Sequence, residues 1–470
     1  MKQLGGGDDI WFAIETDTTP MHILQLGIYD PSTSESAEID LDDVKQFMRE
    51  RLGGLPLRQK LLSVPWNADF PYWIEDEDFD LDQHIRHVRV PPPGDWAALL
   101  SVCGEIMQEP LDRSRPLWDM VLLTDLDDLE GVPEGCFALA QRVHHGQFDG
   151  TNILRLASRI HSTDPKAEPP PADEWEPERT PSGVELLMRA PWNRTQRIFK
   201  GAQVLGSNAP RLIEMLSSSD GDDSSSAESQ PVPQTRFNQA IGTRERVFDG
   251  LTLPLKDVME LRHLVEGATV NDVALSICAG ALRKYLRAKG ELPKDPLAIS
   301  SPVSAHEQDE DESTGNRISA MFAALPTDVA DPLERLRLVR QATKRSKDTT
   351  EEIGAGNMAD VINTIPTYLL GPLVDAIVRF GLIEYLPNPA SGVSITNVPG
   401  PRKPSYFRGA RLVRGIGCPF LFDGVGLIIA ISSYCDDFLM QFGSTPKMMP
   451  DPEFFVECLR EAYEELAATQ

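Results

Sequence analysis

The chain lacks paired cysteines, a leader-like start and any long uninterrupted apolar run. Its six cysteines are scattered, with no Cys-x-x-Cys pair and no histidine at metal-ligand spacing. We therefore expect buried free thiols in a reducing compartment and no metal site. Residues 1–7 have no apolar core, which excludes a signal peptide. The longest apolar region, Ile365–Leu382, is interrupted by prolines and charged residues and is no spanning helix. These absences predict a cytoplasmic protein.

Positive charge is also scarce. The sequence has 45 Lys and Arg against 72 Asp and Glu, a formal net charge of -27 at pH 7. Such a surface does not suit nucleic acid, and a phosphate-bearing ligand needs a local basic patch. One candidate patch comprises Arg402, Lys403, Arg408, Arg411 and Arg414. A second lies on one face of a predicted helix and comprises Arg337, Arg340, Lys344 and Lys347. The sequence does not choose between them. Either could hold phosphates, the second could equally meet an anionic membrane surface, and a solvated face explains each as well.

Length and composition predict two domains. With 470 residues and 41% hydrophobic residues, the chain suits two cores of roughly 200 residues each. Two polar stretches, Ser162–Ser182 and Ser217–Gln230, have the composition of linkers, and Gly183–Leu216 between them has helical spacing. We therefore expect an N-terminal domain over 1–183, a helical and disordered linker over 184–245, and a C-terminal domain over 246–470.

Strand and helix patterns alternate in both halves, which predicts an α/β or α+β fold. In the first half we expect strands at Met21–Tyr29, Trp118–Thr124 and Cys136–Val143, and helices at Leu41–Leu52 and Thr151–Ser162. In the second half we expect a long helix at Thr269–Ala288, a hairpin formed by Val425–Ser433 and Phe438–Gly443, and a last helix that starts at Asp451-Pro452.

One motif carries residues suited to catalysis. His-His-x-x-x-Asp-Gly occupies residues 144–150, between a predicted buried strand and a predicted helix. His145 and Asp149 are four residues apart, across a turn that Gly146 and Gly150 can sharpen. An imidazole has a pKa near neutrality, which suits a base that takes a proton from an alcohol. The full pattern arises by chance in on the order of one chain in a thousand. We therefore assign His145 as the candidate general base.

The residues around His145 have structural interpretations as well. His144 suits a supporting role better than direct chemistry. Asp149 is better explained as a residue that holds the loop than as a proton relay. Trp118, which follows Pro116-Leu117, either fills core or lines a pocket.

The start of the long second-half helix supplies another candidate. Thr269 and Asp272 fit a capping box, with Asp in place of the usual Glu. Asn271 then lies in the first turn, near unpaired N–H groups and the positive end of the helix dipole. The position suits a donor to an oxyanion, although simple helix capping explains it too.

Several motifs in the same order resemble the bacterial wax ester synthase/acyl-CoA:diacylglycerol acyltransferase family. Besides His-His-x-x-x-Asp-Gly they are Thr19-Pro20-Met21-His22, the segment Asp112–Trp118, Asn271-Asp272, Pro302-Val303-Ser304, Gly315-Asn316 and the segment Thr396–Pro401. The resemblance spans almost the whole chain.

The resemblance implies two chloramphenicol-acetyltransferase-like, CoA-dependent acyltransferase domains with the active site in a channel between them. It implies that His145 is the general base and that Asn271, Gly150 and Trp118 shape the channel or the oxyanion site. The implied substrates are acyl-CoA and either diacylglycerol or a fatty alcohol, with no separate cofactor. Coenzyme A would use one of the two basic patches.

The chain departs from the family pattern at three places. Ala305-His306 stands where an Arg commonly follows Pro-Val-Ser, Phe148 is bulkier than usual, and Thr396 replaces a Ser. These changes bear on the preferred acceptor and acyl length.

Two rival functions share parts of the pattern. A condensation-type enzyme carries the same histidine motif but expects carrier-bound substrates, and a non-catalytic lipid-inclusion protein would not need an intact motif. Greasy substrates also suggest contact with a membrane or lipid inclusion, for which Ile365–Leu382 is the candidate surface. A buried helix between domains explains that segment as well.

Overall fold

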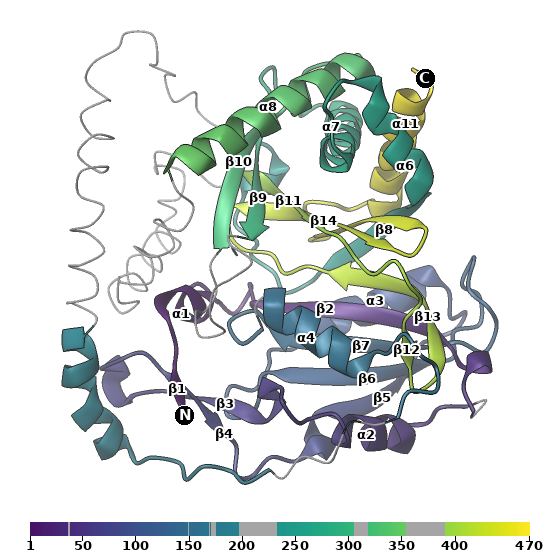
Figure 1. Ribbon diagram of the computed structural model, residues 1–470. Coiled ribbons are helices and arrows are strands. Elements are labelled where there is room, and N and C mark those ends of the chain that lie inside the picture. The colour runs from purple at the N-terminus through teal and green to yellow at the C-terminus, as the bar shows by residue number, and fades with distance from the viewer. Residues whose placement is uncertain are drawn as a thin grey trace.

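A computed structural model provides the fold (Figure 1). It describes residues 1–35, 38–148, 150–168, 170, 175–196, 233–304, 318–353 and 391–470. Two six-stranded sheets lie one above the other in Figure 1, each with helices packed against it. The predicted fold class, a mixed α/β architecture in two parts, is confirmed.

The first sheet carries the histidine motif at the end of a central strand. Its strand order is β12 (Tyr406–Phe407), β13 (Ala410–Cys418), β2 (His22–Asp30), β7 (Phe137–His144), β6 (Trp118–Thr124) and β5 (Ile85–Arg89). Alternate residues of β7 point to opposite faces, so Leu139 and Ala140 enter different cores. One face packs against α2 (Leu41–Arg49) and α4 (Gly150–Ile160), and the other packs against α3 (Trp96–Gln108).

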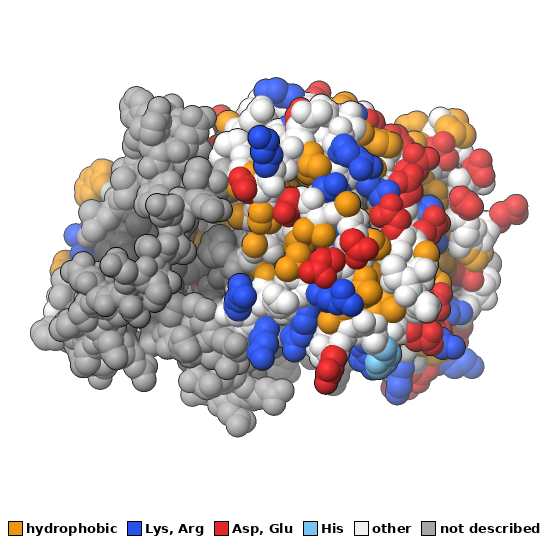
Figure 2. All heavy atoms as spheres, turned by 90° about the horizontal axis from the view of Figure 1, so that it is seen from above, with side chains coloured by type: hydrophobic (Ala, Val, Ile, Leu, Met, Phe, Trp, Pro, Cys, Tyr) orange, Lys and Arg blue, Asp and Glu red, His pale blue; other side chains and the backbone are white. Residues whose placement is uncertain are grey.

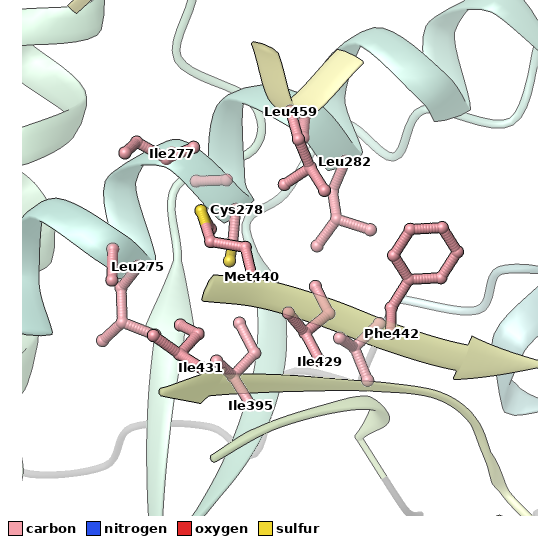
Figure 3. Packing of buried hydrophobic residues seen from close by; sticks show 14 of the residues in the cluster. Leu275, Ile277, Cys278, Leu282, Ile395, Ile429, Ile431, Met440, Phe442 and Leu459 are labelled. Carbon is pink, nitrogen blue, oxygen red and sulfur yellow. The ribbon is translucent and has the colours of Figure 1, made fainter. Parts of the chain in front are cut away.

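The second sheet contains the larger core. Its order is β10 (Ile318–Leu325), β9 (Leu297–Ser304), β11 (Gly392–Val398), β14 (Val425–Tyr434), β15 (Asp437–Ser444) and β8 (Val247–Pro254). The helices packed with it are α6 (Leu255–Leu261), α7 (Val270–Ala288), α8 (Pro332–Ile353) and α11 (Pro452–Ala467). In Figure 3, Leu282 of α7 and Leu459 of α11 lie above Ile429 and Phe442 of the sheet. Each such side chain contributes about 1.5–3 kcal/mol by leaving water.

The C-terminal half contributes two strands to the first sheet. Strands β12 and β13 come from the C-terminal half, yet β13 pairs with β2 of the first sheet. The Gln441 side chain of β15 then joins the sheets: its Nε2 donates to the Gly415 carbonyl at 2.7 Å, and its Oε1 accepts from the Gly417 N–H at 2.6 Å. The prediction of domain boundaries at 183 and 246 did not include this contribution of β12 and β13 to the first sheet. The partner of a strand is set by tertiary pairing and not by local sequence pattern.

A small third sheet lies beside the first. It consists of β1 (Lys2–Gln3), β4 (Tyr72–Glu75) and β3 (Gln59–Leu62). A helix over 183–196 packs against it through Leu186, within a core that also contains Val64 and Ile74. This helix is the described part of the predicted helical stretch Gly183–Leu216.

Several local predictions are confirmed. Thr269 and Asp272 form the predicted capping box at the start of α7. The β14–β15 hairpin turns at Cys435, which has a φ of 52°. All six cysteines are free, and five of them are buried. Among the described residues, no helix has both the length and the apolar character needed to cross a membrane.

Candidate functional site

The histidine motif forms a tight turn at the end of β7. The His145 N–H donates to the Met21 carbonyl at 2.8 Å, which extends the pairing of β7 with β2 beyond the strand. The Gly146 N–H donates back to Nδ1 of His144 at 3.0 Å. A Cβ on Gly146 would lie 2.5 Å from the Phe12 ring, so a larger residue here would displace the ring that stacks on His144. The chain therefore leaves the sheet at the predicted place.

Gln147 anchors this turn to the segment before β6. Its Oε1 accepts from the Leu117 N–H at 3.1 Å, and its Nε2 donates to the carbonyls of Pro56 and Gln59 at 2.8 and 2.9 Å. Sequence reasoning gave Gln147 no role. The sequence pattern does not indicate the partners of Gln147, because they lie in other segments of the chain.

Aromatic rings enclose the His145 imidazole, which is half-buried. Trp11 of α1 (Gly6–Ala13) lies with its ring centroid 4.1 Å away, and Phe420, which follows β13, meets the imidazole edge-on at 5.4 Å. Trp11 and Phe420 also contact each other at 5.5 Å. The imidazole therefore packs against two neighbouring rings, one from the first helix and one from the segment that the C-terminal half sends to this sheet. Sequence reasoning missed both aromatics.

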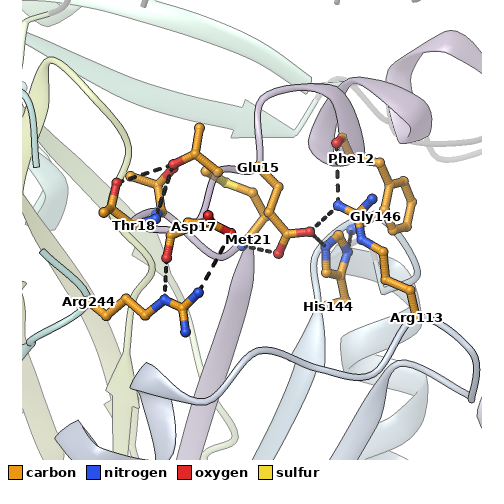
Figure 4. A network of polar contacts seen from close by, with 11 residues as sticks. Phe12, Glu15, Asp17, Thr18, Met21, Arg113, His144, Gly146 and Arg244 are labelled. Carbon is orange, nitrogen blue, oxygen red and sulfur yellow. Dashed lines mark hydrogen bonds and ion pairs between the residues drawn. The ribbon is translucent and has the colours of Figure 1, made fainter. Parts of the chain in front are cut away.

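His144 is buried and held by a separate set of contacts (Figure 4). The Phe12 ring stacks on it at 4.4 Å with an interplanar angle of 5°. Its Nε2 lies 3.5 Å from the Glu15 carboxylate, which also contacts Arg113. Burial opposes the charge of Glu15, but His144 and Arg113 favour it, and together they lower its pKa to about 2. The carboxylate is therefore ionised at neutral pH.

Behind the turn, His22 and Arg142 form a buried polar layer. Burial and the nearby Arg142 lower the pKa of His22 to about 3, so His22 is neutral, and its Nε2 hydrogen-bonds the Met107 carbonyl at 2.9 Å. The Arg142 guanidinium pairs with Asp119 and donates to carbonyls at the end of α3. A buried arginine with several partners holds β6, β7 and α3 in register.

Asn271 at the start of α7 contacts the segment Thr396–Pro401, which begins on β11 of the second sheet. The Asn397 Nδ2 donates to Oδ1 of Asn271 at 3.0 Å, which orients the Asn271 amide with its Nδ2 as the available donor group. Gly400 runs so close to β14 that a Cβ there would lie 1.9 Å from the Ser433 carbonyl. The two motifs that the sequence separates by more than a hundred residues are thus in direct contact.

Asp272, the neighbour of Asn271, has a structural role. It accepts from the Thr269 N–H at 2.8 Å, and Thr343 of α8 donates to its other oxygen at 2.6 Å. Arg340 lies 3.9 Å away. The helix is capped by Thr269 and Asp272, so capping does not account for Asn271.

The remaining motif residues have different surroundings. Trp118 is buried in the core between β6 and α2, where its Nε1 donates to the Leu57 carbonyl at 2.7 Å and its ring stacks on His84. Gly150 is the first residue of α4. Asp149 lies outside the described residues. Phe148 is fully buried in the same core as Trp118.

The first basic patch is not one cluster. Arg408 pairs with Asp43 of α2, whereas Arg414 lies over the Trp96 ring at the start of α3, on the other side of the sheet. Arg402, Lys403 and Arg411 are exposed.

In the second patch, Arg340 faces Asp272 and Arg337 pairs with Glu334. The side chain of Lys347 lies outside the described residues. Figure 2 looks onto the face that carries α8, and there Lys and Arg side chains are interspersed with Asp and Glu.

Three further predictions concern other positions. Ala305-His306 and Ile365–Leu382 lie outside the described residues. Thr396 lies on β11.

Within the described residues, no group of three His, Cys, Asp or Glu side chains is arranged to hold a metal ion.

Comparison with known proteins identifies the family. Residues 4–274 match the wax ester synthase/diacylglycerol acyltransferase catalytic domain, and residues 314–467 match the WS/DGAT C-terminal domain. A Mycobacterium tuberculosis relative named for diacylglycerol O-acyltransferase activity is 31% identical over 442 residues, which cover 93% of this chain and 91% of the relative. The O-acyltransferase WSD of Acinetobacter baylyi is 29% identical over 446 residues, with 93% and 90% covered.

Solved structures agree. The wax ester synthase/diacylglycerol acyltransferase of Marinobacter aquaeolei VT8 is 25% identical, covers 100% of this chain and 99% of its own, and gives a TM-score of 0.68. The starter condensation domain of rhizomide synthetase is 14% identical with a TM-score of 0.54, a likeness of fold alone, so the condensation-type alternative is not favoured. The chain therefore belongs to the wax ester synthase/diacylglycerol acyltransferase family of O-acyltransferases.

Proposed function

We propose that the chain transfers the acyl group of acyl-CoA to the hydroxyl of diacylglycerol, of a long-chain alcohol or of both, giving triacylglycerol or wax ester and free CoA. The proposal needs no cofactor besides the acyl-CoA substrate. The names of the Mycobacterium and Acinetobacter relatives support this substrate class. The observation that carries the proposal is the half-buried His145 imidazole at the end of β7, with rings from both halves of the chain against it.

In the proposed reaction, His145 takes the proton from the acceptor hydroxyl as that oxygen attacks the thioester carbonyl. A tetrahedral intermediate forms, and its oxyanion needs a positioned donor. The Asn271 amide is the proposed donor, because Asn397 turns its Nδ2 away from their shared hydrogen bond. The intermediate then collapses with cleavage of the carbon–sulfur bond, and the His145 imidazolium protonates the leaving thiolate. Asp149 would hold the loop next to the base, and Gly150, at the start of α4, would shape the channel.

An acceptor panel tests the substrate class. Labelled palmitoyl-CoA is incubated with either hexadecanol or diacylglycerol, and the lipid products are separated. We expect labelled ester and stoichiometric free CoA with at least one acceptor, because the reaction conserves the acyl group. A protein that forms ester with neither acceptor, while it remains folded, would contradict the proposed function.

We further propose that the protein works at a lipid surface, where such acceptors reside. An exposed apolar stripe supports this: Val184, Met188 and Trp192 recur every fourth residue on the helix over 183–196, opposite its buried Leu186. The side chain of Trp66 is 88% exposed and adds a second indole. Trp66 lies in a turn, where its φ is 57°. We name these four residues the indole stripe. Unpartnered apolar side chains of this size are costly in water, and tryptophan favours membrane interfaces.

The charge beside the indole stripe fits an anionic lipid. Arg189 and Arg194 are exposed on the same helix, and Glu185 is paired with Arg179 at 2.7 Å. Basic residues next to an apolar helix face are typical of helices that lie in an interface.

Vesicle binding tests the lipid surface without any substrate. We expect the wild type to float with phosphatidylcholine vesicles that contain phosphatidylglycerol, and the Trp66→Ser/Trp192→Ser double variant to bind roughly tenfold more weakly, since it loses two interfacial indoles. Lys256→Ser on α6, at a side chain that is 86% exposed, is the control and should bind as the wild type does. Equal flotation of the double variant would rule out the indole stripe.

A further inference from the structure

Three contacts fix the His144 ring without giving it a place in the proposed proton transfer. The Phe12 ring sets its plane, the Gly146 N–H donates to its Nδ1, and the Glu15 carboxylate lies 3.5 Å from its Nε2. The last distance is that of an electrostatic contact rather than of a well-formed hydrogen bond. All three partners lie within α1, directly after it, or in the turn itself.

The contact to Gly146 indicates where the His144 proton resides. An Nδ1 that accepts a hydrogen bond carries no proton, so the neutral ring must carry its proton on Nε2. That N–H points toward the Glu15 carboxylate. A negative charge at this place favours this tautomer over the other, in the way that a carboxylate partner orients other functional imidazoles.

Glu15 is itself held by groups from two other segments. Its Oε1 accepts from the Met21 N–H at 3.0 Å, and its other oxygen contacts Arg113, within the Asp112–Trp118 motif. Met21 in turn accepts from the His145 N–H through its carbonyl. Glu15 therefore connects the start of β2, the Asp112–Trp118 motif and the turn that carries both histidines (Figure 4).

The same helix also reaches the proposed base. Trp11 packs on His145, and one residue later Phe12 packs on His144. We infer that Glu15 is a positioning residue for the acyl transfer: its carboxylate holds His144 as the Nε2–H tautomer and thereby fixes the turn that presents His145. This inference rests on the proposed role of His145. In this inference Glu15 acts through His144 and the turn and not on the substrate.

Glu15→Gln is the sharpest test, because the amide keeps the shape and can still accept from Met21 while the charge is lost. We expect kcat to fall roughly ten- to a hundredfold, as a misplaced base would cause, with KM for acyl-CoA within about twofold. Glu15→Asp keeps the charge and should retain more activity than Glu15→Gln. Glu105→Gln, an exposed residue of α3, is the matched control and should leave both constants unchanged.

A spectroscopic measurement separates this inference from the proposed function. In ¹⁵N-histidine-labelled protein, the wild-type His144 should show a protonated Nε2 and an unprotonated Nδ1, and Glu15→Gln, which loses the charge but keeps the Gly146 contact, should show a larger fraction of the other tautomer. This result does not depend on which acceptor the enzyme uses. A wild-type His144 protonated on Nδ1 would overturn the inference even if Glu15→Gln failed to fold, and so would an unchanged kcat in a folded Glu15→Gln.

Discussion

His145→Ala is expected to lower CoA release from palmitoyl-CoA by roughly 10³-fold in a thiol-trapping assay. The proposed base accepts the hydroxyl proton and returns it to the thiolate, and a positioned general base is worth about 10²–10⁴ in rate. Removal of the ring leaves acyl-CoA and acceptor binding in place, so the loss should appear in kcat rather than in KM.

The control for this variant is another histidine outside the site. His263 is exposed in the short helix η6 (Arg262–Leu264), and His263→Ala should retain wild-type turnover. Thermal melting of both variants checks that they remain folded. Retained CoA release in a folded His145→Ala protein would refute the assignment of the base.

Asn271→Ala is expected to lower kcat by about 10²–10³-fold, the usual effect of removing one oxyanion donor. The structure sharpens this test, because the capping of α7 depends on Thr269 and Asp272 and not on Asn271. The melting temperature should therefore change little. Steady-state kinetics with saturating acceptor measure the effect.

A second variant separates donation from orientation. Asn397→Ala removes the group that orients Asn271 but leaves the Asn271 amide in place, so its loss of kcat should be smaller than that of Asn271→Ala. If Asn271→Ala turned over at the wild-type rate while folded, the amide would have no part in the reaction.

Local signals in the sequence predicted the features that depend on neighbouring residues. The capping box at Thr269, the turn after β7 and the β14–β15 hairpin each depend on residues a few positions apart. For these features the side-chain chemistry and the backbone conformation lie within one short window.

The parts of the site that were missed depend on contacts across the fold. Trp11 and Glu15 lie in and just after a short N-terminal helix without a strong pattern, and Phe420 follows a strand that joins a distant sheet. Their relation to the histidines is set by packing, which no spacing along the chain reports. A charged residue just before the Thr19–His22 motif is the one signal that could have indicated Glu15.

The basic patches show the same limit in another form. Arg408 and Arg414 are six residues apart in sequence, but the strand between them divides them between two faces of the sheet. A count of positive charges along the chain does not show that the two side chains are separated, because the separation depends on the face of the sheet on which each side chain lies.

The pairing of β13 from the C-terminal half with β2 of the first sheet has a consequence for how the protein folds during synthesis. Until β13 emerges from the ribosome, β2 has no partner on one side, and a sheet edge of buried, apolar residues is exposed to other chains. The first sheet therefore cannot finish folding until the C-terminal half supplies β13. During that interval this edge of β2 is open to pairing with other chains, and it closes only when Ala410–Cys418 has left the ribosome.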